Sequence, residues 1–284
     1  MDANLSHFGQ GVYWYIDDIL IYAESLSTLR ELTRKVKEKI LAMGCQVNED
    51  KSEYEKESLL FVGIQLQGTG VSPNPEQVAK VLATPTPSTK KEAQSALGLV
   101  SYLRDFIPLI SHFNSWLYPD KQGLRLDPDE YQRQWQRLLR HIASAATSLR
   151  HWKQGTPAQL YTDASNIGLG CILIQEGNIV AVTSRKLTPA ETRYSATDRE
   201  HIALVHAATK FKLFLHQSVN DTKVFSDHAA LITRRDDDLM PKQARWKTIV
   251  KYWIPNLTHV KGIDNPADYI SRWMLDIPGG VLKA

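Results

Sequence analysis

Short apolar runs mark the first part of the chain. The segment 12–23 has two apolar and aromatic runs on either side of Asp17-Asp18, which predicts a strand, a tight turn and a second strand. The run 59–66 predicts one further strand, and the glycines in 68–70 predict the turn that follows it.

Apolar positions at helical spacing lie between these runs. Thr28 and Glu31 form a capping-box pair, the apolar residues after them recur on one face, and Gly44 should end this helix. Two prolines after residue 72 introduce a short helix that should continue to Leu82.

Prolines divide the middle of the chain. The stretch 84–88 alternates threonine and proline, and proline restricts its own backbone and that of the residue before it, so a linker is predicted. A helix should begin near Thr89 with Glu92 as its capping-box residue, and another should span about 129–150. Gly-Thr-Pro at 155–157 forms the second break.

From residue 158 onward, strand-like and helix-like segments alternate. Strand character occurs at 160–163, 168–175, 178–184, 223–227 and 257–261, and helical periodicity at 197–215 and 241–252. Pro266 should occupy the first turn of a final helix. This order predicts a mixed α/β fold, with a five-stranded sheet covered by helices.

Length and composition limit the class of protein and the partners that can be expected. The chain has 284 residues, of which 43% are apolar, enough for folded cores. Its net charge of +3 permits a nucleic-acid partner without arguing for one. We expect no membrane contact, because no apolar run could span a bilayer. No secretory signal is evident, and Cys45 and Cys171 form no Cys-x-x-Cys motif, so we expect an intracellular protein, cytoplasmic or nuclear.

Four acidic residues lie at element ends in the second half of the chain: Asp163, Glu200, Asp227 and Asp268. Strand ends and helix starts can converge on one sheet edge, where carboxylate oxygens suit Mg²⁺. Each acid also has an ordinary interpretation as a turn residue, a helix cap or a solvated side chain. Spacing alone favours the ordinary interpretation for any single one of them.

The sequence around these acids resembles that of a known family. YTDASNIGLGCILIQ, SRKLTPAETRYSATDRE, FSDHAAL and HVKGIDNPADYISR are similar, in this order, to the ribonuclease H region of Ty3/gypsy-type LTR retrotransposon polyproteins. YIDDILIYAES, FVGIQLQGTGVSPNPEQV and ALGLVSYLRDFIPLIS resemble the end of the reverse transcriptase palm, the thumb approach and the connecting region. Several long motifs in the right order make the resemblance specific.

The resemblance implies an organisation for the whole chain. Residues 1–83 would form the end of a reverse transcriptase palm and its thumb, a truncated α+β part, and 84–156 a helical thumb or connection region. Residues 157–276 would form a ribonuclease H-like domain, and 277–284 a tail.

It also implies catalytic and metal-binding roles for Asp163, Glu200, Asp227 and Asp268. Two Mg²⁺ or Mn²⁺ ions would be the cofactors, and an RNA–DNA hybrid the substrate. His259 matches a histidine that in the family lies near the site and is a candidate proton shuttle, although a lone histidine on a strand is more often structural. The sequence departs from the family between His259 and Asp268, where it is one residue shorter and has Asn265-Pro266 in place of two apolar residues.

Asp17-Asp18 resemble the Tyr-x-Asp-Asp turn of reverse transcriptases, which holds metal-binding carboxylates. The family's polymerase also needs an earlier aspartate and a fingers region, for which the twelve residues before Tyr13 leave no room. We therefore expect an incomplete RNA-directed DNA polymerase, unless the missing portion or a second chain supplies these parts.

Basic side chains are candidates for holding nucleic-acid phosphates. They are Arg185, Lys186, Arg193, Arg199, Lys210, Lys212, Lys242, Arg245, Lys247 and Lys251, with Trp246 and Trp253 among the last of them. A solvated, salt-bridged helix face is the alternative interpretation of this last group. The run Asp236-Asp237-Asp238 just before it should be an exposed loop.

Three functional hypotheses remain at this point. The first is an active ribonuclease H that cuts the RNA strand of hybrids. The second is a non-catalytic, nucleic-acid-binding or structural remnant, which has no need of four converging acids. The third is a fragment of a longer, fully active reverse transcriptase polyprotein.

Overall fold

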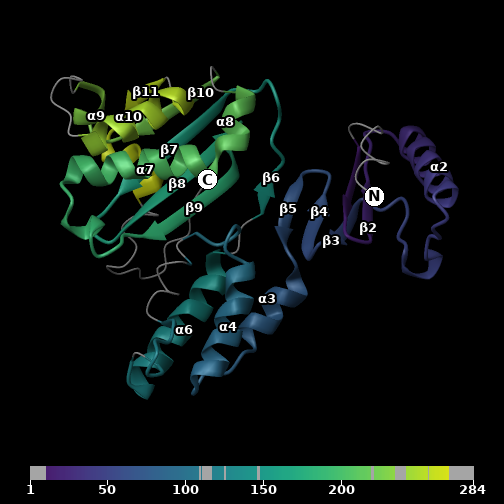
Figure 1. Cartoon of the computed structure of the whole chain (residues 1–284), viewed down its shortest axis with the longest axis horizontal. Helices are drawn as coiled ribbons and strands as arrows, with labels where there is room; N and C mark the ends of the chain where they lie inside the picture. The colour runs from purple at the N-terminus through teal and green to yellow at the C-terminus, as the bar shows by residue number, and fades with distance from the viewer. Residues whose placement is uncertain are drawn as a thin grey trace. The chain divides into compact units, whose positions relative to one another are not determined.

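The computed structural model describes residues 11–108, 110, 117–124, 126–145, 148–218, 221–233, 241–254 and 256–268 (Figure 1). The chain forms two compact units, residues 1–74 and 75–284. The finer domain limits expected near residues 83, 156 and 276 stay predictions. The Asp236–Asp238 run and the expected tail at 277–284 lie outside the described residues.

The first unit contains a hairpin, a helix and a three-stranded meander. Strands β1 (Val12–Tyr15) and β2 (Asp18–Ile21) pair antiparallel, as predicted, and helix α2 (Leu26–Ala42) follows. Strands β3 (Ser58–Phe61), β4 (Ile64–Gln67) and β5 (Gly70–Pro73) are connected by two-residue turns and pair antiparallel in sequence order.

Two local predictions in this unit were wrong. The cap of α2 is Ser25, whose hydroxyl accepts a hydrogen bond from the Thr28 backbone N–H, so the helix begins before the expected capping box. The run 59–66 is a hairpin and not one strand, because Val62 (φ 48°) and Gly63 (φ 75°) turn the chain with left-handed backbones. Valine rarely adopts this conformation, so Gly63 was the only turn signal that the sequence carried there.

Helices α3 (Pro75–Leu82), α4 (Lys90–Tyr102) and α6 (Pro128–Ala145) begin the second unit. Thr89 caps α4 and Glu92 reaches back to the Ser88 N–H, which confirms the predicted start. Helix α6 ends at Ala145, earlier than expected, and a short strand, β6 (Leu149–Arg150), takes the end of the predicted helical stretch. Trp135 of α6 is fully buried, and its indole N–H donates to the Thr84 carbonyl oxygen.

The rest of the second unit has the predicted five-stranded mixed sheet, in the order β11-β10-β7-β8-β9. Its strands are β7 (Ala158–Ala164), β8 (Gly168–Gln175), β9 (Asn178–Lys186), β10 (Thr222–Ser226) and β11 (Leu257–His259). The pairs β7–β8 and β8–β9 are antiparallel, whereas β10 lies parallel to both β7 and β11.

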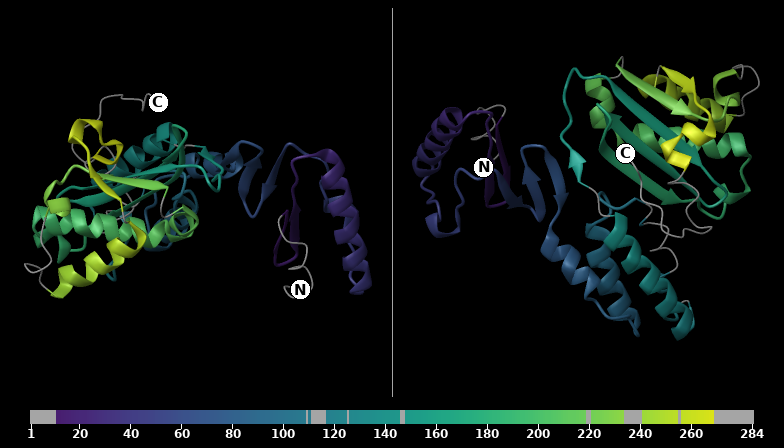
Figure 2. Two further views of the ribbon diagram at one scale, coloured as in Figure 1. Left: turned by 90° about the horizontal axis from the view of Figure 1, so that it is seen from above. Right: turned by 180° about the vertical axis from the view of Figure 1, so that it is seen from behind.

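Helices α7 (Ala196–Lys210), α8 (Lys212–Ser218), α9 (Ala230–Thr233) and α10 (Pro241–Trp253) accompany this sheet. The single helix expected over 197–215 is interrupted at Phe211, which is buried and separates α7 from α8. One apolar core joins Leu160, Leu173 and Val224 of the sheet to side chains of α7, α8 and α10. These helices therefore cover one sheet face, and Figure 2 shows α7 and α10 together on that side. None of the described helices is long and apolar enough to span a membrane.

Candidate active site

Asp163 lies near the end of β7, the central strand of the five-stranded sheet. Antiparallel β8 pairs with β7 at Asp163, opposite Gly170, whereas the pairing of parallel β10 with β7 ends at Tyr161. The Asp163 side chain is only 1% exposed. A carboxylate at this depth loses most of its hydration, so its charge must be balanced from within the protein.

Glu200 approaches Asp163 from α7. Ser195 caps this helix through the Asp198 N–H, which places Glu200 in the second turn of the helix. The Glu200 side chain is 5% exposed, and its Oε1 accepts a hydrogen bond of 3.0 Å from the Ala164 N–H at the end of β7. The second oxygen, Oε2, is buried and has no hydrogen-bond partner in the part of the chain that the structure describes.

Asp227 follows β10 directly and is half-buried. Two residues, one at the end of β11 and one after it, lie close to Asp227. His259 Nε2 lies 3.1 Å from the Asp227 carbonyl oxygen, and a Cβ atom added to Gly262 would lie 3.1 Å from Asp227 Oδ2. Glycine at position 262 therefore leaves the space that the Asp227 carboxylate occupies.

The fold brings three of the four predicted acids together. Carboxylate oxygens of Asp163, Glu200 and Asp227 all lie within 4.8 Å of one another, the one such group of three among the described residues. Burial raises the pKa of Glu200 to about 9, and the Asp163 and Asp227 charges act in the same direction. Three converging carboxylates, one with an unpartnered buried oxygen, suit a divalent cation with oxygen ligands.

Asp268 is not a member of this three-carboxylate group. It is half-buried, and its backbone N–H donates to the Asn265 carbonyl oxygen at 3.0 Å. Asn265 in turn contacts β7 beside Asp163, since its Nδ2 donates to the Thr162 carbonyl oxygen. The role expected for Asp268 stays a prediction.

His259 lies at the end of β11 and is exposed. A carbonyl oxygen can only accept, so the His259 Nε2 atom must carry a proton to bond the Asp227 carbonyl oxygen. This contact anchors the loop that carries Asp227. The part of His259 in proton transfer stays a prediction.

Sequence reasoning missed several residues around the acids. His228 Nε2 lies 2.8 Å from Thr197 Oγ1, which joins the loop after β10 to the first turn of α7. The His228 N–H also donates to Ser226 Oγ. For Ser226 and His228, the only signal in the sequence was that they are adjacent to Asp227. No signal in the sequence indicated that Gly262 lies against Asp227 or that Asn265 bonds Thr162.

Asp17 and Asp18 lie in different surroundings. Both are exposed at the turn of the β1–β2 hairpin, and no further described acid joins them in a group of three. Ile16, the first residue of this turn, has a φ of 55°, which is unfavourable for a β-branched side chain. Strain of this kind is more common at functional turns, which fits the resemblance of this motif.

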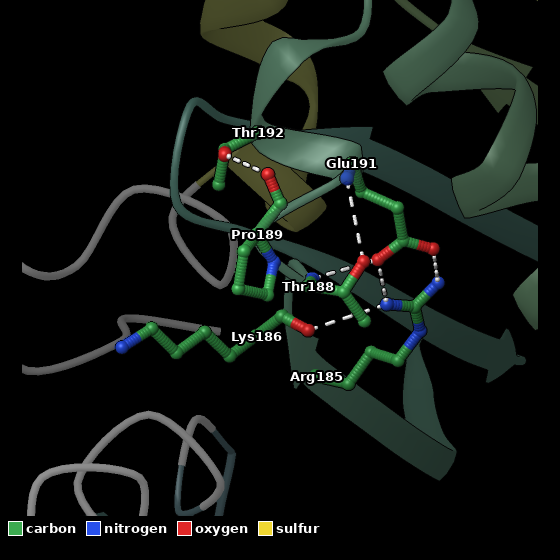
Figure 3. A network of polar contacts seen from close by, with 6 residues as sticks. All are labelled: Arg185, Lys186, Thr188, Pro189, Glu191 and Thr192. Carbon is green, nitrogen blue, oxygen red and sulfur yellow. Dashed lines mark hydrogen bonds and ion pairs between the residues drawn. The ribbon is translucent and has the colours of Figure 1, made fainter.

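Arg185 and Glu191 form a closed ion pair (Figure 3). The guanidinium donates to both carboxylate oxygens at 2.7 and 2.8 Å and to the Lys186 carbonyl oxygen at 3.2 Å. Glu191 also accepts from the Thr188 N–H, and the Arg185 hydrogen bonds lower the pKa of Glu191 to about 2. The Arg185 charge is therefore largely neutralised inside the chain, whereas Figure 3 shows the Lys186 side chain extending away from this network.

The other predicted basic residues are distributed over several elements: Arg193 lies before α7, Arg199 and Lys210 in α7, Lys212 in α8, and the rest in α10. Lys242 Nζ lies 3.4 Å from the ring centre of Tyr194 and 4.6 Å from that of Trp246, so two aromatic faces hold this cation at the surface. Arg193 and Arg245 are exposed and Lys247 is half-buried. Phosphate contacts by any of these residues stay predictions.

Comparisons with known proteins agree with this architecture. Residues 1–66 match the family described as reverse transcriptase (RNA-dependent DNA polymerase), and residues 153–252 match the RNase H-like domain found in reverse transcriptase. The Tf2-3 transposon polyprotein of Schizosaccharomyces pombe is 28% identical over 95% of the chain, which spans 21% of that polyprotein. The Pol polyprotein from transposon gypsy of Drosophila melanogaster is 29% identical over 97% of the chain, which spans 28% of its length.

Solved structures show the same fold. The foamy viral protease-reverse transcriptase in complex with an RNA/DNA hybrid matches all of the chain with a TM-score of 0.77, at 20% identity and over 39% of that protein. The same viral enzyme in complex with double-stranded DNA matches 92% of the chain with a TM-score of 0.74, at 22% identity and over 56% of that protein.

Proposed function

The chain belongs to the Ty3/gypsy-type retrotransposon Pol polyproteins, with reverse transcriptase and RNase H-like sequence, and we propose that its second unit is a metal-dependent ribonuclease H. Its substrate would be the RNA strand of an RNA–DNA hybrid. The observation that carries the proposal is the convergence of Asp163, Glu200 and Asp227 within 4.8 Å at the end of β7.

The raised pKa of Glu200 supports the proposal that a cation is bound in this group. Without a cation, burial first and the neighbouring charges of Asp163 and Asp227 second raise the pKa of this carboxyl group to about 9, which favours its protonated form at neutral pH. Two divalent ions would activate a water molecule and stabilise the leaving oxygen of the phosphodiester. Asp163, Glu200 and Asp227 would hold these ions, and Asp268 would complete the set from the last described helical turn.

The surrounding residues would position the acids. Glu200 is oriented by the Ala164 N–H, and the loop carrying Asp227 by His259 and by the Thr197–His228 contact. Lys242 on its aromatic support would contact a phosphate of the hybrid, a type of contact that does not depend on base sequence.

For the first unit we propose a dependent role. Asp17 and Asp18 would take part in nucleotide addition only together with a third carboxylate from another segment or a second chain. This part of the proposal rests on the exposed turn and on the absence of a third acid beside it among the described residues.

Cleavage of a labelled RNA–DNA hybrid with Mg²⁺ or Mn²⁺ tests the proposal. Purified protein should cut the RNA strand, and EDTA or the Asp163→Asn substitution should abolish the cut. Asp221→Asn is a matched control, because Asp221 is exposed and lies outside the acidic group. Double-stranded RNA and DNA of the same sequence should remain intact.

A second outcome would favour a different function. If folded protein binds the hybrid but does not cut it with either metal, the chain is a non-catalytic binding module. Cleavage that persists in Asp163→Asn would instead place the nuclease activity elsewhere or in a contaminant.

A further inference from the structure

Asn265 is a buried amide next to the acidic group. Its side chain is 4% exposed, and both of its polar ends form hydrogen bonds inside the protein. Nδ2 donates to the Thr162 carbonyl oxygen at 3.0 Å, and Oδ1 accepts from the Ala267 N–H at 3.1 Å. One neutral side chain thus joins the central strand to the start of the last described helical turn.

The contact with Thr162 lies just beyond the point where β10 stops pairing with β7. The pairing of β10 with β7 ends at Phe225 and Tyr161, and β10 itself ends one residue later, at Ser226. Thr162 is the next residue of β7, and Asp163 follows it. The Asn265 amide therefore supplies a donor to β7 just beyond the last paired residue of β10, next to the most deeply buried carboxylate.

The other contacts of Asn265 begin the segment that carries Asp268. Asn265 accepts from Ala267 with its side chain and from the Asp268 N–H with its carbonyl oxygen, at 3.1 and 3.0 Å. Asparagine is a preferred helix cap, and Pro266 suits the position after a cap because it has no N–H to satisfy. Asn265-Pro266 is thus a capped helix start tied to the strand.

We propose that Asn265 is a positioning residue that sets the placement of Asp268 relative to Asp163 and thereby the affinity of the site for divalent cations. This inference rests on the proposed function of the same acids. Asn265 itself would touch neither metal nor substrate. It acts through Thr162 and Asp268, and hydrogen-bonding neighbours of metal ligands typically change metal affinity by about 10- to 100-fold when they are replaced.

Two substitutions separate the two roles of the Asn265 amide, which are to donate to Thr162 and to cap the helical turn. Serine at position 265 would keep a hydroxyl that can cap the helix but would lose the Nδ2 donor to Thr162. Alanine would lose both the cap and the donor. Asn256→Ser is the matched control, because Asn256 is exposed and precedes β11.

The test measures Mn²⁺ binding by calorimetry, together with the Mg²⁺ concentration that gives half-maximal hybrid cleavage. Asn265→Ser should weaken Mn²⁺ binding about tenfold and raise the half-saturating Mg²⁺ concentration by a similar factor, with most of kcat restored at saturating metal. Asn265→Ala should show at least the same loss, and Asn256→Ser should match the unsubstituted protein. Thermal unfolding without metal checks that each variant is folded.

The inference is overturned if folded Asn265→Ser binds Mn²⁺ as tightly as the unsubstituted protein, or if Asn256→Ser loses as much. If Asn265→Ser does not fold, Asn265→Gln replaces it, since this variant keeps the amide but displaces it by one methylene. Direct Mn²⁺ binding keeps the two proposals distinguishable: a protein whose Mn²⁺ affinity depends on Asn265 but that cuts no hybrid contradicts only the proposed nuclease.

Discussion

The two acidic motifs of this chain, Asp17-Asp18 in the first unit and the group around Asp163 in the second, contain the same functional group in opposite surroundings. Asp163 and Glu200 are almost completely buried, and they come from a strand and a helix that are joined by a hydrogen bond. Asp17 and Asp18 are exposed on a hairpin of two short strands. Both motifs resemble metal-binding carboxylates, but only the second is enclosed by its own unit.

The difference teaches that burial and not residue type gives a carboxylate unusual chemistry. Water around an exposed aspartate screens neighbouring charges, whereas a buried one interacts strongly with each charge beside it. The pKa of Glu200 is raised by burial first and by Asp163 second, and both causes require the five-stranded sheet and α7 to be assembled. An isolated hairpin cannot create such an environment.

The largest expected effect breaks the second motif and spares the first. Glu200→Gln should lower hybrid cleavage by about three orders of magnitude, since loss of a metal ligand removes several kcal/mol of transition-state stabilisation. The double substitution of Asp17 and Asp18 by asparagine should leave cleavage unchanged. Steady-state cleavage rates of the two variants check this, and equal losses would contradict the assignment of the nuclease to the second unit.

A smaller effect is expected at Gly262. An added Cβ would lie 3.1 Å from Asp227 Oδ2, so Gly262→Ala should displace that carboxylate and reduce Mg²⁺-dependent cleavage about tenfold. Gly98 in α4 has open space around its missing Cβ, so Gly98→Ala is the matched control. This control should retain activity and gain about 0.5–1 kcal/mol in unfolding free energy, because alanine favours helix. Full activity of Gly262→Ala would show that Asp227 tolerates displacement.

The pH dependence of stability should also distinguish the two motifs. The folded-state pKa of Glu200, about 9, lies above its ordinary value of 4.5, so the native protein holds a proton that the unfolded chain releases. Without metal, the contribution of Glu200 to stability therefore falls as pH rises from about 4.5 to about 9, by at most about 1.4 kcal/mol per pH unit. Urea unfolding at several pH values should show this slope in the Asp17→Asn variant and a reduced slope in Glu200→Gln.

Binding of a divalent cation should abolish this dependence, because the cation keeps the Glu200 carboxylate ionised in the folded protein as it is in the unfolded chain. Mn²⁺ binding near neutral pH should release protons, which calorimetry in buffers of different ionisation enthalpy detects. Release of no proton would mean that Glu200 is already ionised before the cation binds.

The smallest expected effects concern the basic residues. Lys242→Ala should weaken hybrid binding. It should also reduce the steepness of a plot of log affinity against log salt concentration by about one, as expected for one lost phosphate contact. Arg185→Met should leave this salt dependence unchanged and lower the unfolding free energy by about 1 kcal/mol, since its charge is paired with Glu191 in a partly exposed ion pair. Titration of hybrid binding at several salt concentrations separates the two. A loss of salt dependence in Arg185→Met would show that the ion pair opens to bind phosphate.

Local sequence determined most of the secondary structure. The strand pattern at 168–175, the Thr89–Glu92 capping pair and the proline at position 241 each depend on neighbours in the chain, and the structure confirms the elements that they predicted. The errors occurred where backbone conformation went against residue preference. Val62 adopts a left-handed turn conformation that valine does not favour, and the buried Phe211 interrupts a helix that its periodicity predicts as continuous.

The sequence by itself determined which acids this protein has, and the motifs around them indicated the family. Only the tertiary structure decided that Asp163, Glu200 and Asp227 converge, and that Asn265 bonds both Thr162 and the Asp268 N–H. The physical reason is that these contacts join residues far apart in the chain. Asn265 and Thr162, for example, are joined by a single buried hydrogen bond. Such a bond depends on where the sheet places its strand ends, which no local pattern of residues encodes.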